Sequence, residues 1–145
     1  MRLNLQSDYA LRMLMHLASS PDRLVTIGEV ADRFRISHNH LMKVAYLLGK
    51  EGLITTMRGR SGGLRLAGRA EKIRVGDVVR RMEGDIHIVE CFAAEPGGCV
   101  ISGACKLKGV MHEALNAFLN VLDRYTLADL VANPKLRALL NSEAA

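Results

Sequence analysis

The 145-residue sequence has no apolar run that approaches the roughly 18 consecutive residues of a membrane-spanning helix, so no membrane partner is expected. Its first residues also lack the long apolar segment of a secretory signal peptide, and we therefore expect a cytoplasmic protein. Internal repeats and low-complexity tracts are absent as well. With 49% hydrophobic residues, a chain of this length can bury one good core.

Recognisable catalytic motifs are also missing. The sequence has no paired carboxylates, no nucleophile elbow and no phosphate-binding loop. The glycine-rich stretch Gly59–Gly63 does not fit the P-loop pattern. We predict that the protein is not an enzyme.

Cysteine is scarce, and its placement is informative. The three cysteines, Cys91, Cys99 and Cys105, lie within fifteen residues of one another. An odd number of cysteines in an intracellular chain favours a metal site or reactive thiols over a disulfide framework. The intervening Pro96, Gly97, Gly98 and Gly103 predict a loop without regular structure, of the kind that something else must organise.

The spacing of these cysteines bears on what they bind. Thiolates select zinc, copper(I) and iron–sulfur clusters. Structural zinc sites usually contain a pair of ligands two to four residues apart. Here seven residues separate the first two cysteines and five separate the second two, which favours a larger object such as a cluster. Zinc and purely structural cysteines stay open as alternatives. A thiol redox switch also stays open, because Lys106 and Lys108 lie beside a cysteine at a predicted helix start.

Positive charge is concentrated in the first half of the chain. Residues 1–80 contain 14 Lys and Arg against 7 Asp and Glu, whereas residues 81–145 contain 6 against 8. A basic half joined to a mildly acidic half is typical of a nucleic-acid-binding domain attached to a sensing or dimerisation segment.

The basic half carries the pattern of a helix-turn-helix. Ser7 is expected to cap a first helix, with Asp8 in its first turn. Thr26 and Glu29 have the spacing of a capping box and open a short helix over residues 27–33. Ser37 is expected to cap the next helix, which ends near residue 52. Two such helices across a short turn predict a helix-turn-helix.

A basic hairpin follows this pair of helices. Residues 53–57 and 63–66 read as strands, joined by the glycine-rich turn 58–62 that carries two arginines. We therefore predict a mainly α fold, with a winged helix-turn-helix DNA-binding domain over residues 1–82. Double-stranded DNA is the expected partner, with recognition-helix residues in the major groove and the wing in the minor groove or on phosphates. The predicted DNA-binding residues are Arg33, Arg35, Ser37, His38, Asn39, His40, Lys43, Arg58, Arg60, Ser61 and Gly62.

Residues 83–145 are predicted to hold the cysteine-bearing loop and a long C-terminal helix, in one compact unit with the first domain. From residue 105 to residue 125 the apolar residues repeat at spacings of four and three, which is a heptad seam. A seam of this length in so small a chain favours packing against a second copy, and so predicts a homodimer. The residues of the seam are Leu107, Met111, Ala114, Phe118, Val121 and Tyr125.

Four segments together resemble a known family. They are residues 7–12, the wing 58–66, the three-cysteine loop, and residues 125–130. The combination resembles the bacterial winged-helix regulators that include NsrR and IscR, and within them the nitric-oxide-sensing repressors of the NsrR type. The resemblance covers nearly the whole chain. It implies a repressor that binds a two-fold symmetric operator as a homodimer.

The resemblance also implies a cofactor and a signal. Cys91, Cys99 and Cys105 would hold an iron–sulfur cluster, 4Fe-4S in preference to 2Fe-2S, whose reaction with nitric oxide controls operator affinity. IscR-like members place a histidine three residues after the last cysteine, where this chain has Lys108. The NsrR-type pattern instead implies Asp8 of the partner subunit as the fourth ligand. Other local candidates for that ligand are His87, Glu90 and His112. An IscR-like sensor of iron–sulfur status is the alternative.

Overall fold

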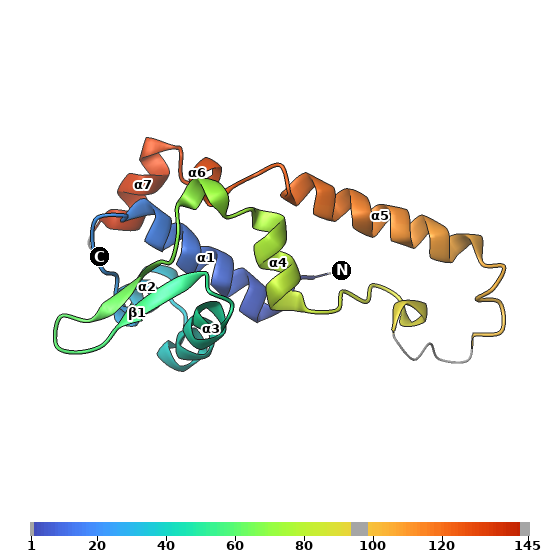
Figure 1. The fold of residues 1–145 in the computed structure, drawn as a ribbon, viewed down its shortest axis with the longest axis horizontal. Helices are drawn as coiled ribbons and strands as arrows, with labels where there is room; N and C mark the ends of the chain where they lie inside the picture. The colour runs from blue at the N-terminus through green and yellow to red at the C-terminus, as the bar shows by residue number, and fades with distance from the viewer. Residues whose placement is uncertain (1, 94–98, 143–145) are drawn as a thin grey trace.

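The structure is a computed structural model that describes residues 2–93 and 99–142. In these residues the chain is mainly helical, with one two-stranded sheet (Figure 1). The elements are α1 (Leu5–Ser19), α2 (Ile27–Phe34), α3 (His38–Lys50), β1 (Ile54–Met57), β2 (Gly63–Leu66), η1 (Ala70–Lys72), α4 (Val75–Glu83), η2 (Glu90–Phe92), α5 (Lys106–Leu122), α6 (Leu127–Leu130) and α7 (Pro134–Asn141). None of the described helices is long and apolar enough to cross a membrane.

Helix α1 begins earlier than the sequence predicts. Its N-cap is Asn4, whose Oδ1 accepts a hydrogen bond from the backbone N–H of Ser7 at 2.7 Å. The prediction that Ser7 caps this helix is wrong, because Ser7 lies inside the first turn with its side chain buried. Asp8 does lie in the first turn, where the positive end of the helix dipole favours a carboxylate.

The helix-turn-helix consists of α2 and α3, and both predicted N-caps are confirmed. Thr26 Oγ1 accepts from the backbone N–H of Glu29 at 3.1 Å, and Ser37 Oγ accepts from that of His40 at 3.2 Å. The predicted capping box is wrong, since the Glu29 carboxylate pairs with Arg23 at 2.7 Å instead of turning back to Thr26. Arg35 ends α2 with φ 53° and so makes the tight turn into α3.

The wing is an antiparallel hairpin in the predicted place. Ile54 pairs with Leu66 and Met57 pairs with Gly63. Gly59 has φ 111°, which only glycine adopts readily. A Cβ at Gly62 would collide with the carbonyl oxygen of Met57, so the turn also needs glycine there. These two requirements explain the glycine-rich turn between the strands.

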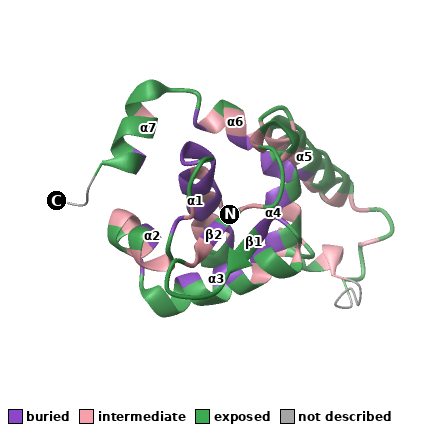
Figure 2. Cartoon of the chain, turned by 60° about the vertical axis from the view of Figure 1, so that its left-hand side comes forward, coloured by how far each residue is buried: buried purple, intermediate pink, exposed green. Residues whose placement is uncertain are grey.

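Helix α1 is the centre of the core. Figure 2 shows it mostly buried, with α3, α4 and the sheet around it. Helices α6 and α7 return to the same core, where Leu127, Val131 and Leu140 are buried. Asn141 fixes α7 to the end of α1, because its Oδ1 accepts from Ser20 Oγ at 2.6 Å. Residues 127–141 therefore pack with the helices that precede the wing.

Helix α5 differs from the others because most of it projects from the body (Figure 1). Leu115 is its one buried residue. Apolar side chains elsewhere on the helix are open to solvent in the single chain: Leu107 is 63% exposed, Val110 50% and Val121 47%. An apolar helix face of this extent is typical of a surface that packs against another protein chain.

His16 on α1 is a buried polar residue inside the half of the chain predicted to bind DNA. It is 2% exposed, and neither ring nitrogen has a hydrogen-bond partner among the described residues. Burial, followed by the positive charge of Arg23, lowers the pKa of His16 below its ordinary value of 6.5. The folded protein therefore holds this imidazole neutral where the unfolded chain would bind a proton.

The lowered pKa of His16 predicts that the free energy of unfolding depends on pH. A depressed pKa contributes stability that is present above pH 6.5 and is lost as the pH falls toward the folded-state value. We expect His16→Leu to remove this loss of stability at low pH. At neutral pH we expect the variant to raise the free energy of unfolding by roughly 1 kcal/mol, because it removes two buried ring nitrogens that lack hydrogen-bond partners among the described residues. Thermal unfolding at pH 7.5 and pH 5 measures both effects, with the exposed His38→Leu as control. An equal drop in Tm for wild type and His16→Leu would contradict the assignment.

Candidate nucleic-acid interface and cysteine site

Helix α3 presents a polar face to solvent. His38, Asn39, His40 and Lys43 are exposed, while the other face of the helix, including Leu41, is buried in the core. Ser37 is exposed at the N-cap. The face combines an amide, which can make paired hydrogen bonds to adenine, with a lysine suited to phosphate.

Two large exposed side chains of α3 were not among the predicted DNA-binding residues and share its polar face. Met42 is 51% exposed and Tyr46 is 72% exposed. They continue the face that begins at Asn39, because residues three, four and seven apart lie on one side of a helix. The helical spacing was a usable signal for Tyr46. His40, the residue after Asn39, lies against Tyr9 of α1, with ring centroids 6.1 Å apart.

The wing tip is basic and open. Arg58, Arg60 and Ser61 are exposed, and Gly62 is half-buried in the turn. In the described part of the chain neither arginine takes part in an ion pair. Their guanidinium groups are therefore available for an anionic partner.

The two arginines at the end of α2 differ in their surroundings. Arg35 is exposed at the turn into α3. Arg33 is half-buried and donates from Nη1 to Ser142 Oγ at 3.3 Å, so it lies toward α7. A phosphate contact by Arg33 stays a prediction.

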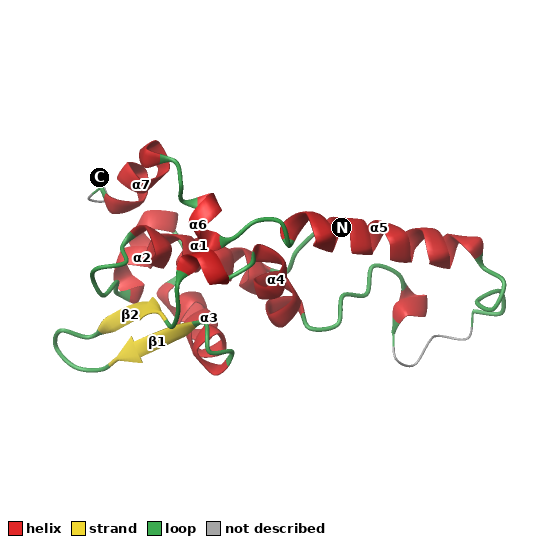
Figure 3. Cartoon of the chain, turned by 45° about the horizontal axis from the view of Figure 1, so that its top comes forward, coloured by secondary structure: helices red, strands yellow, loops and turns green. Residues whose placement is uncertain are grey.

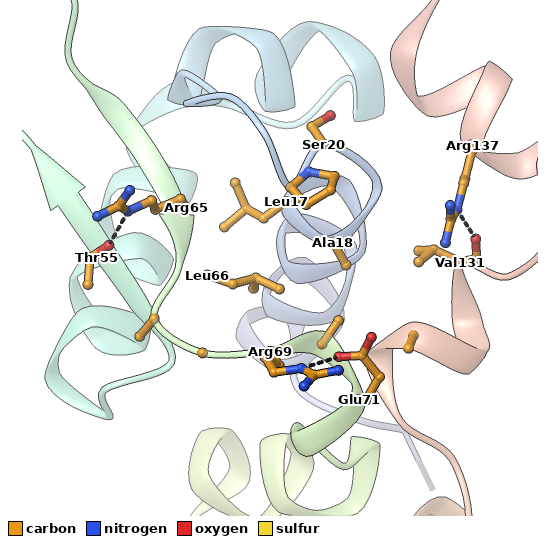
Figure 4. Close-up of a pocket in the computed structure, with 15 residues that line it drawn as sticks. Leu17, Ala18, Ser20, Thr55, Arg65, Leu66, Arg69, Glu71, Val131 and Arg137 are labelled. Atoms are coloured by element: carbon orange, nitrogen blue, oxygen red, sulfur yellow. Dashed lines mark hydrogen bonds and ion pairs between the residues drawn. The ribbon is translucent and has the colours of Figure 1, made fainter.

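The root of the wing borders a cavity of about 590 Å³ between α1, the sheet and the C-terminal helices (Figure 4). Leu66 lies between the sheet and α1 on its floor. Arg65 Nε donates to Thr55 Oγ1 at 3.4 Å across the strands, and Arg137 Nε donates to the Val131 carbonyl at 2.6 Å. The polar groups on the rim are thus engaged within the protein, and the cavity lies apart from the cysteines.

The three cysteines are free thiols, and residues 100–104 form turns without a helix or strand. Cys91 is half-buried in η2, Cys99 is exposed, and Cys105 is half-buried at the N-cap of α5. The predicted irregular residues Pro96, Gly97 and Gly98 lie outside the described residues. Gly103 lies in a turn before α5.

Cys91 faces an open cavity of about 510 Å³ between its own segment and α5. His87, Lys108 and His112 line the same cavity. The Phe92 ring packs on the imidazole of His112, with centroids 4.9 Å apart. Two of the alternative ligands predicted from sequence, His87 and His112, thus lie around Cys91, and Glu90 is its exposed neighbour.

Asp8 is placed elsewhere in the same chain. It is not among the described residues that line the cavity around Cys91, and its carboxylate pairs with Arg12 at 2.8 Å. Its side chain remains 41% exposed. A ligand role for Asp8 therefore needs a second chain, as the family resemblance implies.

The donor set fits a soft metal centre by its chemistry. The three free thiols are soft donors that can bind a metal as thiolates. Within the described residues no three His, Cys, Asp or Glu side chains are close enough to hold a metal ion. Binding would have to bring the thiols together, as happens when metal binding and local folding are coupled.

Comparison with known proteins identifies the family. The family model named Rrf2, described as an iron-dependent transcriptional regulator, matches residues 3–133. The chain belongs to the Rrf2 family. Its relatives are named as transcriptional regulators, so the predictions of a regulator and of a protein that is not an enzyme are confirmed.

Members of the Rrf2 family similar to this chain include proteins named HTH-type transcriptional regulator NsrR. That of Shouchella clausii is 51% identical over 142 residues, covering 97% of this chain and 95% of the relative. That of Bacillus subtilis is 52% identical over 134 residues, covering 92% of each. The predicted resemblance to NsrR-type regulators is therefore confirmed.

Solved structures support the predicted winged-helix fold. IscR of T. potens aligns with a TM-score of 0.74 at 26% identity, covering 91% of this chain and 87% of that one. CymR of B. subtilis, named the global cysteine regulator, aligns with a TM-score of 0.70 at 25% identity, covering 91% and 97%. The predicted fold class is confirmed.

Proposed function

We propose that this Rrf2 regulator is a cytoplasmic transcriptional repressor whose affinity for its operator depends on an iron–sulfur cluster that responds to nitric oxide. The observation that carries the proposal is the set of three free cysteines between α4 and α5, in a chain about half identical to regulators named NsrR over nearly its full length. The rest of the proposal assigns roles to the residues of this chain.

Cys91, Cys99 and Cys105 are the proposed cluster ligands, and Asp8 of the partner subunit is the proposed fourth. A 4Fe-4S cluster needs four ligands, and the chain has three cysteines. When bound, the cluster supplies iron that nitric oxide can attack. A carboxylate ligand suits this role because it binds iron less strongly than a thiolate does. The half-exposed Asp8 carboxylate is accessible to another chain, although it must give up its pairing with Arg12.

The exposed face of α3 is the proposed reader of the major groove. Asn39 and His38 lie at the N-terminal end of that helix, which is the end that contacts bases in helix-turn-helix proteins. Tyr46 extends the face by its phenol, which can donate a hydrogen bond to phosphate. Arg58 and Arg60 at the wing tip supply charge for the minor groove or the phosphates.

The exposed apolar face of α5 is the proposed homodimer contact. Two copies related by a two-fold axis would bury the same face of each helix and match a two-fold symmetric operator. Leu107, Val110 and Val121 have the exposed apolar area for this contact.

Val110→Asp tests this interface. A charge buried in an apolar contact is strongly unfavourable, so we expect the dimer dissociation constant to rise by about 100-fold or more. Sedimentation equilibrium measures it. The matched control is Asn120→Asp, which places the same charge on the polar side of the same helix and should leave the dimer intact. Dimers of equal strength in both variants would exclude this face.

Native mass spectrometry of anaerobically isolated protein tests the proposed cofactor. We expect a dimer whose mass includes one cluster for each chain, and whose iron becomes nitrosylated when nitric oxide is added. A dimer that carries zinc, or no metal after anaerobic reconstitution with iron and sulfide, would refute the proposed function and favour a zinc or thiol switch.

A further inference from the structure

Helix α5 is fastened to the DNA-binding half by one ion pair of near-ideal geometry. Arg80 of α4 donates from Nη1 and Nη2 to the two carboxylate oxygens of Asp123, each at 2.7 Å. Asp123 is the C-cap of α5. The two side chains are only 40% and 26% exposed. Two parallel hydrogen bonds between planar groups fix orientation as well as distance.

A glycine in α4 makes room for this pair. Gly76 is buried one turn before Arg80, and a Cβ there would collide with the Asp123 carboxylate. Glycine is a poor helix former, and this one has no turn or cap to explain it, because it lies in the second position of α4 with no positive φ. The close approach of Asp123 is the feature that requires it.

Backbone hydrogen bonds complete the joint beside the ion pair. The N–H of Val75 donates to the Tyr125 carbonyl at 2.9 Å, and the N–H of Leu127 donates to the Ile73 carbonyl at 2.9 Å. The chain leaving α5 is thereby held against the chain entering α4. The C-terminal end of α5 is a fixed end, and its N-terminal end carries Cys105.

The fixed end connects the cysteine segment to the recognition helix through packed elements. The 17 residues of α5 span about 26 Å between Cys105 and Asp123. Helix α4 packs on α1, and α1 packs on α3 (Figure 3). A displacement at Cys105 can therefore reach α3 because α5 and α4 move together, and α4 packs on α1.

We infer that the Arg80–Asp123 pair, seated on Gly76, is the coupling joint that transmits the state of the cysteine segment to the DNA-reading helices. The inference rests on the proposed function. Neither residue touches the cluster ligands or the DNA face, so both are positioning residues. The pair holds α5 at a fixed angle to α4, because it makes two parallel hydrogen bonds and is closely packed. A single flexible ion pair would let α5 rotate against α4.

The charge state of the pair is stable across the working pH range. The hydrogen bonds from Arg80 lower the pKa of the Asp123 carboxyl, and the pairing with Asp123 raises the pKa of Arg80. Both groups therefore stay ionised near neutral pH, so the joint responds to position and not to pH.

The test compares two disruptive variants with a matched control. Asp123→Asn removes the charge of the pair, and Gly76→Ala introduces the obstructing methyl while improving helix propensity. Asp77→Asn is the control, because Asp77 is exposed and contacts Arg80 only at 3.7 Å. For each variant, operator affinity is measured for the protein with and without its cluster. The operator is a DNA fragment that cluster-loaded wild-type protein selects from a pool of genomic fragments. Cluster absorbance and the rate of its reaction with nitric oxide are measured in parallel.

We expect both disruptive variants to bind the cluster and react with nitric oxide like wild type, while the ratio of loaded to cluster-free operator affinity falls about tenfold. The control should keep the wild-type ratio. Wild-type ratios in Asp123→Asn and Gly76→Ala would overturn the coupling joint alone. Equal affinities of the two forms of the wild-type protein would overturn the proposed function, and the joint with it.

Discussion

Cys99→Ala is expected to weaken cluster binding by at least about 10- to 100-fold and to lower operator affinity to that of the cluster-free protein. Cys99 is the exposed member of the three thiols, and removing it leaves two thiolates for a cluster that needs four ligands. Even the loss of an outer-shell contact costs metal sites about 10- to 100-fold in affinity, so the loss of a ligand costs at least as much. Iron and sulfide analysis after anaerobic reconstitution measures the occupancy.

The adjacent Val100→Ala is the matched control for this prediction. Val100 is 97% exposed in the same segment, so its truncation disturbs the chain equally but removes no donor. Wild-type iron content is expected in this control. Full cluster occupancy in Cys99→Ala would show that this cysteine is not a ligand.

Arg60→Ala is expected to weaken operator binding about tenfold without changing cluster content. The Arg60 side chain is exposed at the wing tip and has no ion-pair partner among the described residues, so DNA would be its first strong contact. For comparison, the loss of a specific arginine–base contact costs roughly 1–3 kcal/mol of binding free energy. Because an arginine neutralises phosphate charge, its loss also makes the dependence of log affinity on log salt less steep, by about one.

Gel-shift titrations at several salt concentrations measure both quantities. Arg69→Ala is the matched control, because Arg69 is an exposed arginine beyond the wing that already pairs with Glu71. It is expected to change operator affinity much less than Arg60→Ala does. Equal effects of the two substitutions would mean that the wing contributes only general positive charge.

Local sequence signals were enough to predict most of the fold. Hydroxyl caps at Thr26 and Ser37 mark the starts of α2 and α3, and each makes the expected hydrogen bond. The glycine-rich turn predicts the wing, because the close backbone approach at Gly62 admits no side chain. These features depend on residues within five positions of one another, and such short-range rules transfer well to a new sequence.

Features that depend on distant residues could not be predicted in the same way. Ser7 has the right chemistry for an N-cap, but Asn4 takes that position, and its own N–H donates to Glu83 Oε1 at 2.9 Å. The pairing of Arg80 with Asp123 joins residues 43 positions apart, and no periodicity marks it. Tertiary packing decides which of several suitable polar side chains forms the cap or the ion pair.

Some parts of the candidate site were easier to predict from the sequence than others, because some of its residues are related only through tertiary structure. Helical periodicity identifies the exposed face of α3, and the same periodicity extended one turn beyond Lys43 includes Tyr46. The cysteine spacing indicates a soft metal centre, but the proposed fourth ligand, Asp8, would come from a second chain. Asp8 and Cys91 lie far apart in the sequence and do not share a cavity among the described residues, so spacing alone could not relate them.

The measurement that tests the account most directly is a titration of the selected operator fragment with cluster-loaded protein, before and after stoichiometric nitric oxide under anaerobic conditions. Fluorescence anisotropy at fixed salt reports the affinity, and absorbance of the same samples reports the cluster. The account predicts tight binding by the loaded dimer, and a loss of at least tenfold in affinity as the cluster reacts. Unchanged affinity after the cluster has fully reacted would contradict the claim that this Rrf2 regulator controls DNA binding through its three cysteines.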